Sequence, residues 1–146
     1  MHSILLVGSG GREDALVWKL SQSLDVSSIY VLPGNDAMTR HPKTQCISGS
    51  TSSESILSAA QKYRPDLVMI GPEQPIVDGV SDQLKEHGFL VCAPSAQAAQ
   101  LEGSKIYSKE FMRQFGIPTA KSVSSDSYQE AMEALDSWDF ETGIVI

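Results

Sequence analysis

A glycine-rich segment near the start of the chain has the composition of an anion-binding turn. Residues 8–13 (GSGGRE) follow the apolar run 4–7 (ILLV) and precede a stretch whose apolar residues recur at helical spacing. Glycines let the backbone turn tightly and bring bare N–H groups to an anion at the N-terminus of the following helix. The segment therefore predicts an anion-binding site, and the alternative is a tight strand–helix turn that binds no ligand.

The same segment partly fits the dinucleotide-binding pattern G-x-G-x-x-G. Gly8 and Gly10 take the first two positions, but Glu13 stands at the third. The second predicted strand ends in Leu32-Pro33, where that motif places an acidic residue for the ribose. A dinucleotide-binding oxidoreductase domain is therefore the weaker alternative.

Glu73 stands in a second candidate segment, residues 71–75 (GPEQP), directly after the apolar run 66–70. In an open parallel sheet, ligands bind at the carboxyl ends of the strands, so this segment and the glycine-rich turn should share one edge. A carboxylate in a loop between two prolines could accept hydrogen bonds from ribose hydroxyls. The alternative is a solvated loop glutamate.

Lys105 belongs to a third candidate segment, residues 101–105 (LEGSK). A lysine in the first turn of a helix opposes the helix dipole, which favours an anionic partner nearby. The alternative is a surface lysine without a ligand.

The elements that must position these residues alternate between apolar runs and helical stretches, which is typical of a parallel sheet with helical crossovers. Strands are predicted at 4–7, 28–32, 66–70 and 89–92, with short ones near 46–47 and 121–123 and a last one at 143–146. Helices are predicted at about 12–21, 52–63, 77–87, 95–101, 104–115 and 127–137. Near-continuous apolar strands are covered on both faces. We therefore expect an α/β fold, an open parallel sheet with helices on both faces.

The pattern changes after Ser95, where two helices follow each other without an apolar strand between them. We expect one domain over residues 1–102 and the beginning of a second over 103–146. Because the sequence stops within a predicted strand, the second domain is expected to be truncated.

Composition excludes several other classes of protein. The formal net charge is -7, from 18 acidic and 11 basic residues, and no basic stripe for nucleic acid is present. Cys46 and Cys92 form no CxxC pair, and His2, His41 and His87 are scattered, so reduced thiols and no metal site are expected. The first residues resemble neither a signal peptide nor a membrane span, which predicts a cytoplasmic protein.

Taken together, the motifs resemble the phosphoribosylamine–glycine ligases (glycinamide ribonucleotide synthetases) of the ATP-grasp superfamily. The resemblance rests on segments that keep the family's order and approximate spacing across nearly the whole chain. These are 8–13, 33–35 (PGN), 71–77 (GPEQPIV) with Gly79, 98–105 (AAQLEGSK), 111–112 (FM) and 116–120 (GIPTA).

The resemblance implies a Rossmann-like, pre-ATP-grasp domain followed by the start of an ATP-grasp domain. The complete enzyme would use ATP and Mg²⁺ (or Mn²⁺) to join glycine to 5-phosphoribosylamine, giving glycinamide ribonucleotide, ADP and phosphate in de novo purine synthesis. Gly10, Gly11, Arg12 and Glu13 would line the phosphoribosylamine site, and Glu73 would hold its ribose. Lys105 would reach the ATP phosphates.

For this chain by itself the resemblance implies binding without catalysis. No catalytic residue, metal ligand or tightly bound cofactor is expected in it, and no ligase activity. Its partners would be phosphoribosylamine, glycine, ATP and the missing C-terminal remainder of the same chain, with no nucleic acid and no membrane. The alternative is a non-catalytic module that binds a nucleotide or a sugar phosphate.

One departure from the family pattern concerns the glycine-rich turn. The family usually has a histidine after this motif, whereas this chain has Asp14. A carboxylate beside an anion-binding turn should weaken contact with phosphate, so we expect the turn to meet the sugar or the amine instead.

Overall fold

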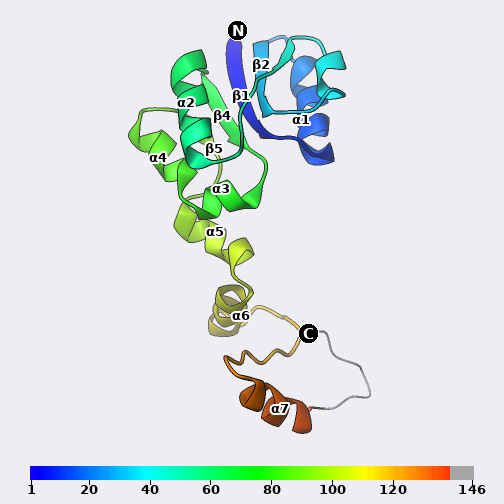
Figure 1. Ribbon diagram of the computed structural model, residues 1–146, viewed down its shortest axis with the longest axis vertical. Helices are drawn as coiled ribbons and strands as arrows, with labels where there is room; N and C mark the ends of the chain where they lie inside the picture. The colour runs from blue at the N-terminus through cyan, green and yellow to red at the C-terminus, as the bar shows by residue number, and fades with distance from the viewer. Residues whose placement is uncertain (139–146) are drawn as a thin grey trace. The chain divides into compact units, whose positions relative to one another are not determined.

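The computed structural model describes residues 1–138, and its first part is built on a five-stranded sheet (Figure 1). Neighbouring strands are all parallel and follow the order β3-β2-β1-β4-β5. The strands are β1 His2–Gly8, β2 Val26–Pro33, β3 Thr44–Cys46, β4 Leu67–Ile70 and β5 Val91–Cys92. This confirms the predicted open parallel α/β sheet.

Helices cover both faces of the sheet because β1 sends alternate side chains into two separate cores. Leu5 and Val7 pack in one core and Ile4 and Leu6 in the other, each at most 3% exposed. The second core includes Val17 of α1 (Gly11–Ser21). The first core is covered by α2 Ser53–Tyr63, α3 Glu73–Val77, α4 Val80–Glu86 and α5 Ala96–Gly103.

Local sequence explains where α2 begins and ends. Ser52 is its N-cap and accepts a hydrogen bond from the Ser55 backbone N–H at 3.3 Å. Arg64 ends the helix in the left-handed conformation, with a φ of 47°. The predicted helix over 52–63 is therefore confirmed almost to the residue.

Three predicted boundaries are wrong. The helix expected over 77–87 begins only at Val80, as α4, because Gly79 adopts a φ of 91° and separates it from α3, which forms in the segment expected to be a loop. Between β2 and β3, the short strand predicted near 46–47, the chain also forms a short 3-10 helix, Met38–Arg40, that was not predicted. β5 pairs over only two residues, Val91 and Cys92, instead of the expected four.

The chain divides into two compact units, Met1–Gly103 and Ser104–Ile146. The second contains α6 Lys105–Gln114 and α7 Tyr128–Asp136, each preceded by a serine N-cap. The strand expected at 121–123 is wrong, because these residues are coil in the structure. The strand expected at 143–146 lies outside the described residues. Within residues 1–138, no helix is both long enough and apolar enough to cross a bilayer.

Candidate functional site

The parallel sheet brings three chain segments to one edge, at the carboxyl ends of β1, β2 and β4. Gly8 ends β1 beside Pro33 of β2, and Val7 lies beside Ile70 of β4. Backbone hydrogen bonds continue past the strands, from Gly34 N–H to Gly8 O at 3.1 Å and from Gly71 N–H to Val7 O at 3.0 Å. The glycine-rich turn, the turn after β2 and the segment after β4 therefore lie together.

Glu13 is the structural centre of the glycine-rich turn. Its side chain is buried, at 6% exposure, and its Oε2 accepts a hydrogen bond from the Gly10 N–H at 2.7 Å. This contact satisfies one of the backbone donors that the start of α1 leaves without a helical partner. Glu13 thus stabilises the turn from within.

The glycines around Glu13 leave room for its side chain. A Cβ at Gly8 would lie 2.6 Å from Glu13 Cγ, and Gly8 also has a φ of 129°. A Cβ at Gly71, on the neighbouring strand end, would overlap the Glu13 carboxylate. In a dinucleotide-binding turn the third glycine allows close packing, whereas here Glu13 occupies that position. The turn is therefore built around a buried carboxylate.

The second oxygen of this carboxylate, Glu13 Oε1, is buried without a hydrogen-bond partner among the described residues. Its nearest ionic neighbour is Arg12 Nε, at 3.9 Å. Burying a carboxylate oxygen without a hydrogen bond is unfavourable, so the guanidinium offsets part of that cost. Arg12 therefore interacts with Glu13 as well as with Glu73.

Arg12 and Glu73 form the charged surface of the site. Arg12 Nη1 donates to Glu73 Oε1 at 3.1 Å, with the side chains 65% and 44% exposed. The backbone N–H of Glu73, and then the Arg12 guanidinium, hold the pKa of the Glu73 carboxyl below its ordinary value. The hydrogen bond that Arg12 donates to Glu73 raises the pKa of Arg12 in turn. The structure therefore brings two of the predicted site residues into direct contact.

Glu73 does not lie in a loop, as the sequence suggested. It is the first residue of α3, with Pro72 as N-cap and Pro75 two positions further on. Proline fits the first turn of a helix because the backbone N–H groups of that turn have no carbonyl acceptor within the helix, so the N–H that proline lacks costs no hydrogen bond. The two prolines therefore start a short helix that fixes Glu73 at the sheet edge.

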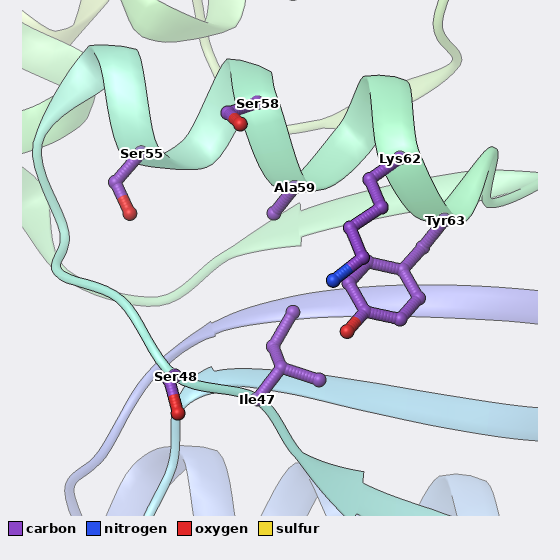
Figure 2. A pocket seen from close by; sticks show the side chains of 7 residues that line it. All are labelled: Ile47, Ser48, Ser55, Ser58, Ala59, Lys62 and Tyr63. Atoms are coloured by element: carbon purple, nitrogen blue, oxygen red, sulfur yellow. The ribbon is translucent and has the colours of Figure 1, made fainter.

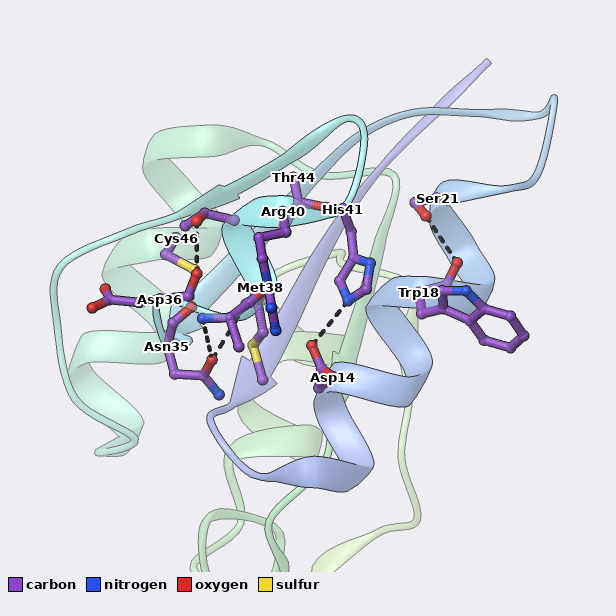
Figure 3. A network of polar contacts seen from close by, with 12 residues as sticks. Asp14, Trp18, Ser21, Asn35, Asp36, Met38, Arg40, His41, Thr44 and Cys46 are labelled. Atoms are coloured by element: carbon purple, nitrogen blue, oxygen red, sulfur yellow. Dashed lines mark hydrogen bonds and ion pairs between the residues drawn. The ribbon is translucent and has the colours of Figure 1, made fainter.

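Asn35 connects the turn after β2 to the glycine-rich turn. Its Nδ2 donates to Ser9 O at 2.7 Å, and its Oδ1 accepts from the Ala37 and Met38 backbone N–H groups at 2.8 and 3.3 Å. Figure 3 shows the Oδ1 contact beside Cys46, whose Sγ donates to Asn35 O at 3.4 Å. The Pro-Gly-Asn motif of residues 33–35 predicted no particular role for Asn35.

A second link joins Asp14 to His41. Asp14 Oδ1 and His41 Nε2 are 3.0 Å apart and point toward each other in Figure 3. His41 follows the short 3-10 helix Met38–Arg40, so this contact ties the β2–β3 connection to α1. The sequence did not predict this contact between Asp14 and His41.

The remaining predicted residues differ in exposure and location. Gly10 is the N-cap of α1, and Gly11, its first residue, is exposed with open space where a Cβ would stand. Lys105 is the exposed first residue of α6 and belongs to the second compact unit, whereas the other predicted site residues belong to the first. Glu102 of α5 was missed: its side chain makes a smaller contribution to lowering the pKa of Glu73. Its only sequence signal was its position in the 98–105 motif.

Comparison with known sequences points to enzymes of purine biosynthesis. The profile "Phosphoribosylglycinamide synthetase, N domain" matches residues 2–102. The phosphoribosylamine–glycine ligase of Clostridium acetobutylicum is 39% identical over 132 residues, which are 90% of this chain and 32% of that protein. A bifunctional purine biosynthetic protein of Pichia angusta is 42% identical over 134 residues, which are 90% of this chain and 17% of that protein.

A solved structure agrees with these sequence matches. The crystal structure of the phosphoribosylamine–glycine ligase from Thermotoga maritima matches with a TM-score of 0.69 and 26% identity, covering 94% of this chain and 31% of that one. The chain therefore spans between 17% and 32% of the length of these three relatives.

Proposed function

The chain belongs to the phosphoribosylglycinamide synthetase family, and we propose that it supplies the phosphoribosylamine-binding part of an ATP-dependent ligase of purine synthesis. The complete reaction would join glycine to 5-phosphoribosylamine and release glycinamide ribonucleotide, ADP and phosphate. The Clostridium ligase is a longer protein, of which this chain spans 32%. Residues 103–146 would begin the ATP-grasp domain.

The contact between Arg12 and Glu73 is the observation that carries the proposal. Arg12 comes from the glycine-rich turn and Glu73 from the segment after β4, and their side chains meet at 3.1 Å on the exposed edge of the sheet. A guanidinium presents a planar fork of donors, of which this contact uses Nη1. The pair therefore offers free donors and a carboxylate acceptor at one place, which suits a ligand with phosphate and hydroxyl groups.

Each residue would then have a distinct role toward phosphoribosylamine. Glu73 accepts hydrogen bonds from the ribose hydroxyls, and its lowered pKa keeps the carboxylate ionised for that purpose. Arg12 and the first backbone N–H groups of α1, at Gly11 and Arg12, face the more negative parts of the ligand. Glu13, being buried, acts by holding the turn in shape.

Catalysis in such a ligase depends on positioning the amine for attack on the carboxyl carbon of glycine. The residues at this edge would orient the ribose so that its amine nitrogen points toward that carbon. ATP, when bound by the complete protein, would activate the glycine carboxylate. Lys105 would contact the ATP phosphates as an exposed cation at the start of α6. Within residues 1–138 no three His, Cys, Asp or Glu side chains are grouped to hold a metal ion.

The test is calorimetric titration of the 146-residue chain with glycinamide ribonucleotide. We expect saturable binding that Glu73→Gln weakens about tenfold, or about 1.4 kcal/mol, because a charged acceptor becomes a neutral one. Glu54→Gln is the matched control, since Glu54 is an exposed glutamate in the first turn of α2, as Glu73 is in α3. The control should bind like the unaltered chain.

Two results would count against the proposal. Equal affinity of Glu73→Gln and the unaltered chain would remove Glu73 from the site. Ribose 5-phosphate binding as tightly as glycinamide ribonucleotide would favour the alternative, a module that binds sugar phosphates without taking part in ligation.

A further inference from the structure

A hollow of about 290 Å³ lies beside α2, lined by none of the site residues discussed above (Figure 2). Its apolar floor is made by Ile47, just after β3, and by Ala59 of α2, which are 5% and 8% exposed. The ring of Tyr63 forms one wall and is itself fixed by the ring of Tyr30, with the centroids 4.6 Å apart. The hollow therefore has a firm apolar base.

Polar side chains line the rest of the hollow. Ser55, Ser58 and Lys62 are spaced by three and four residues, so they lie on one face of α2. Ser48 lies across from them, on the chain that leaves β3. In Figure 2 the Lys62 ammonium bends toward Ile47 and the ring of Tyr63. Hydroxyl groups and a cation thus face the same space.

Most of these groups have spare hydrogen-bonding capacity. Among the described residues, no side-chain hydrogen bond or ion pair involves Ser48, Ser58 or Lys62. The Lys62 Nζ lies 5.0 Å from the centroid of the Tyr63 ring, a cation–π contact that leaves its three donors available. Ser55 Oγ accepts from the Ser50 N–H at 3.0 Å and still has its own proton to donate. The hollow therefore offers donors to an acceptor-rich ligand.

The distance along the helix sets the size of that ligand. Seven residues separate Ser55 from Lys62, which corresponds to about 10 Å along an α-helix. The volume lies near the lower end of the range for small-molecule sites, about 300 to 1,000 Å³. A six-carbon chain or ring with one charged end matches both dimensions, and its C–H groups can pack on Ile47, Ala59 and Tyr63.

We propose that this hollow binds a small polyhydroxylated anion, a sugar phosphate or a sugar acid, with the anionic group at Lys62 and the hydroxyls at the serines. The helix dipole favours acceptor groups at the Ser55 end of α2, whereas at the other end the Lys62 ammonium, and not the helix, would attract the anion. The binding surface is separate from the Arg12–Glu73 edge, so this proposal does not depend on the function proposed above.

The test is an amide chemical-shift titration of the ¹⁵N-labelled 146-residue chain at constant ionic strength. The probes are glucose 6-phosphate, gluconate and uncharged glucitol, which separate a phosphate from a carboxylate and either one from a plain polyol. We expect saturable shifts at Ser48, Ser55, Ser58 and Lys62 with at least one anion, and about tenfold weaker binding of glucitol.

Two variants make the test specific. Lys62→Gln should weaken binding of the anion about tenfold, because among residues 1–138 Lys62 is the only charged donor that lines the hollow. Lys19→Gln is the matched control, since Lys19 also lies in the last turn of its helix, α1, and should leave binding unchanged. Ser58→Ala should weaken binding by a smaller factor while the spectrum stays that of a folded chain.

Three results would overturn the proposal. The first is the absence of saturable shifts with both anions. The second is an equal loss of binding in Lys19→Gln and Lys62→Gln, which would indicate a general charge effect. The third is a set of shifts centred on Gly10, Gly11 and Glu73, which would place the ligand at the sheet edge instead.

Discussion

The Glu13 carboxylate lies so close to the α-carbon of Gly71 that a methyl group there would overlap it. These residues belong to different segments, the glycine-rich turn after β1 and the chain that leaves β4. Gly71 is therefore needed for the space it leaves to Glu13. The contact also explains how the two segments hold Arg12 and Glu73 within hydrogen-bonding distance of each other.

Gly71→Ala should therefore lower the free energy of unfolding by about 1–3 kcal/mol, the usual cost of adding a methyl group to a filled space. The measurement is urea denaturation followed by circular dichroism. Gly11→Ala is the control, because a Cβ at Gly11 meets open space at the start of α1 and should be neutral or stabilising. In a Glu13→Ala background the cost of Gly71→Ala should shrink; an unchanged cost would mean that the two residues are not coupled.

The buried carboxylate itself should contribute to stability. Glu13→Ala removes the acceptor for the Gly10 N–H and should cost about 1–3 kcal/mol in unfolding free energy. Glu13→Gln keeps an acceptor of the same length and should retain most of that stability. Denaturation of both variants decides the matter, and equal losses in the two would show that the charge on Glu13, and not its hydrogen bond, stabilises the turn.

Asn35 should act as a tether for the glycine-rich turn. Asn35→Ala removes the donor to Ser9 O and the acceptor for Ala37 and Met38, with an expected loss of about 1–2 kcal/mol. Asn35→Asp keeps the acceptor and loses only the donor, so its unfolding free energy should lie between those of the unaltered chain and Asn35→Ala. Amide hydrogen exchange at Gly10 and Gly11 should quicken in both variants, and unchanged exchange would refute the tether.

Stability should fall in acid partly through Asp66. The backbone N–H and then the hydroxyl of Ser3 hold the pKa of the Asp66 carboxyl below its ordinary value of 3.8. The folded chain therefore binds a proton at Asp66 less readily than the unfolded chain does. The contribution of Asp66 to the free energy of unfolding is complete above the ordinary pKa, and it is lost as pH falls through the pKa of the folded state. Unfolding free energies measured from pH 6 down to pH 2 should decline less steeply in Asp66→Asn. An equally steep decline would exclude this carboxylate as a cause.

Much of the fold followed from sequence because its local signals agree with its packing. The unbroken apolar run of β1 feeds two cores, and Ser52 marks the start of α2. The split between α3 and α4 was missed because the left-handed conformation of Gly79 cannot be distinguished by composition from that of a helical glycine. β3 was hard to place because it is three residues long at the sheet edge, with a polar central residue, Gln45.

The site was predicted less completely than the fold. Arg12 and Glu73 came from motifs that follow strands, and parallel topology puts such motifs at one edge. The burial of Glu13 was not predicted, because a charged residue beside glycines suggests a contact with a ligand. Only the structure shows that Gly8 and Gly71 enclose its side chain. The link between Asp14 and His41 joins residues 27 positions apart and has no local pattern to reveal it.

The most direct test of the central claim is an amide chemical-shift map of the 146-residue chain with glycinamide ribonucleotide. Binding at the Arg12–Glu73 edge predicts that the largest saturable shifts fall on Gly10, Gly11 and Glu73, while those on α2 stay small. Shifts confined to other parts of the chain, or no saturable shift at all, would contradict the assignment of this edge as the phosphoribosylamine site.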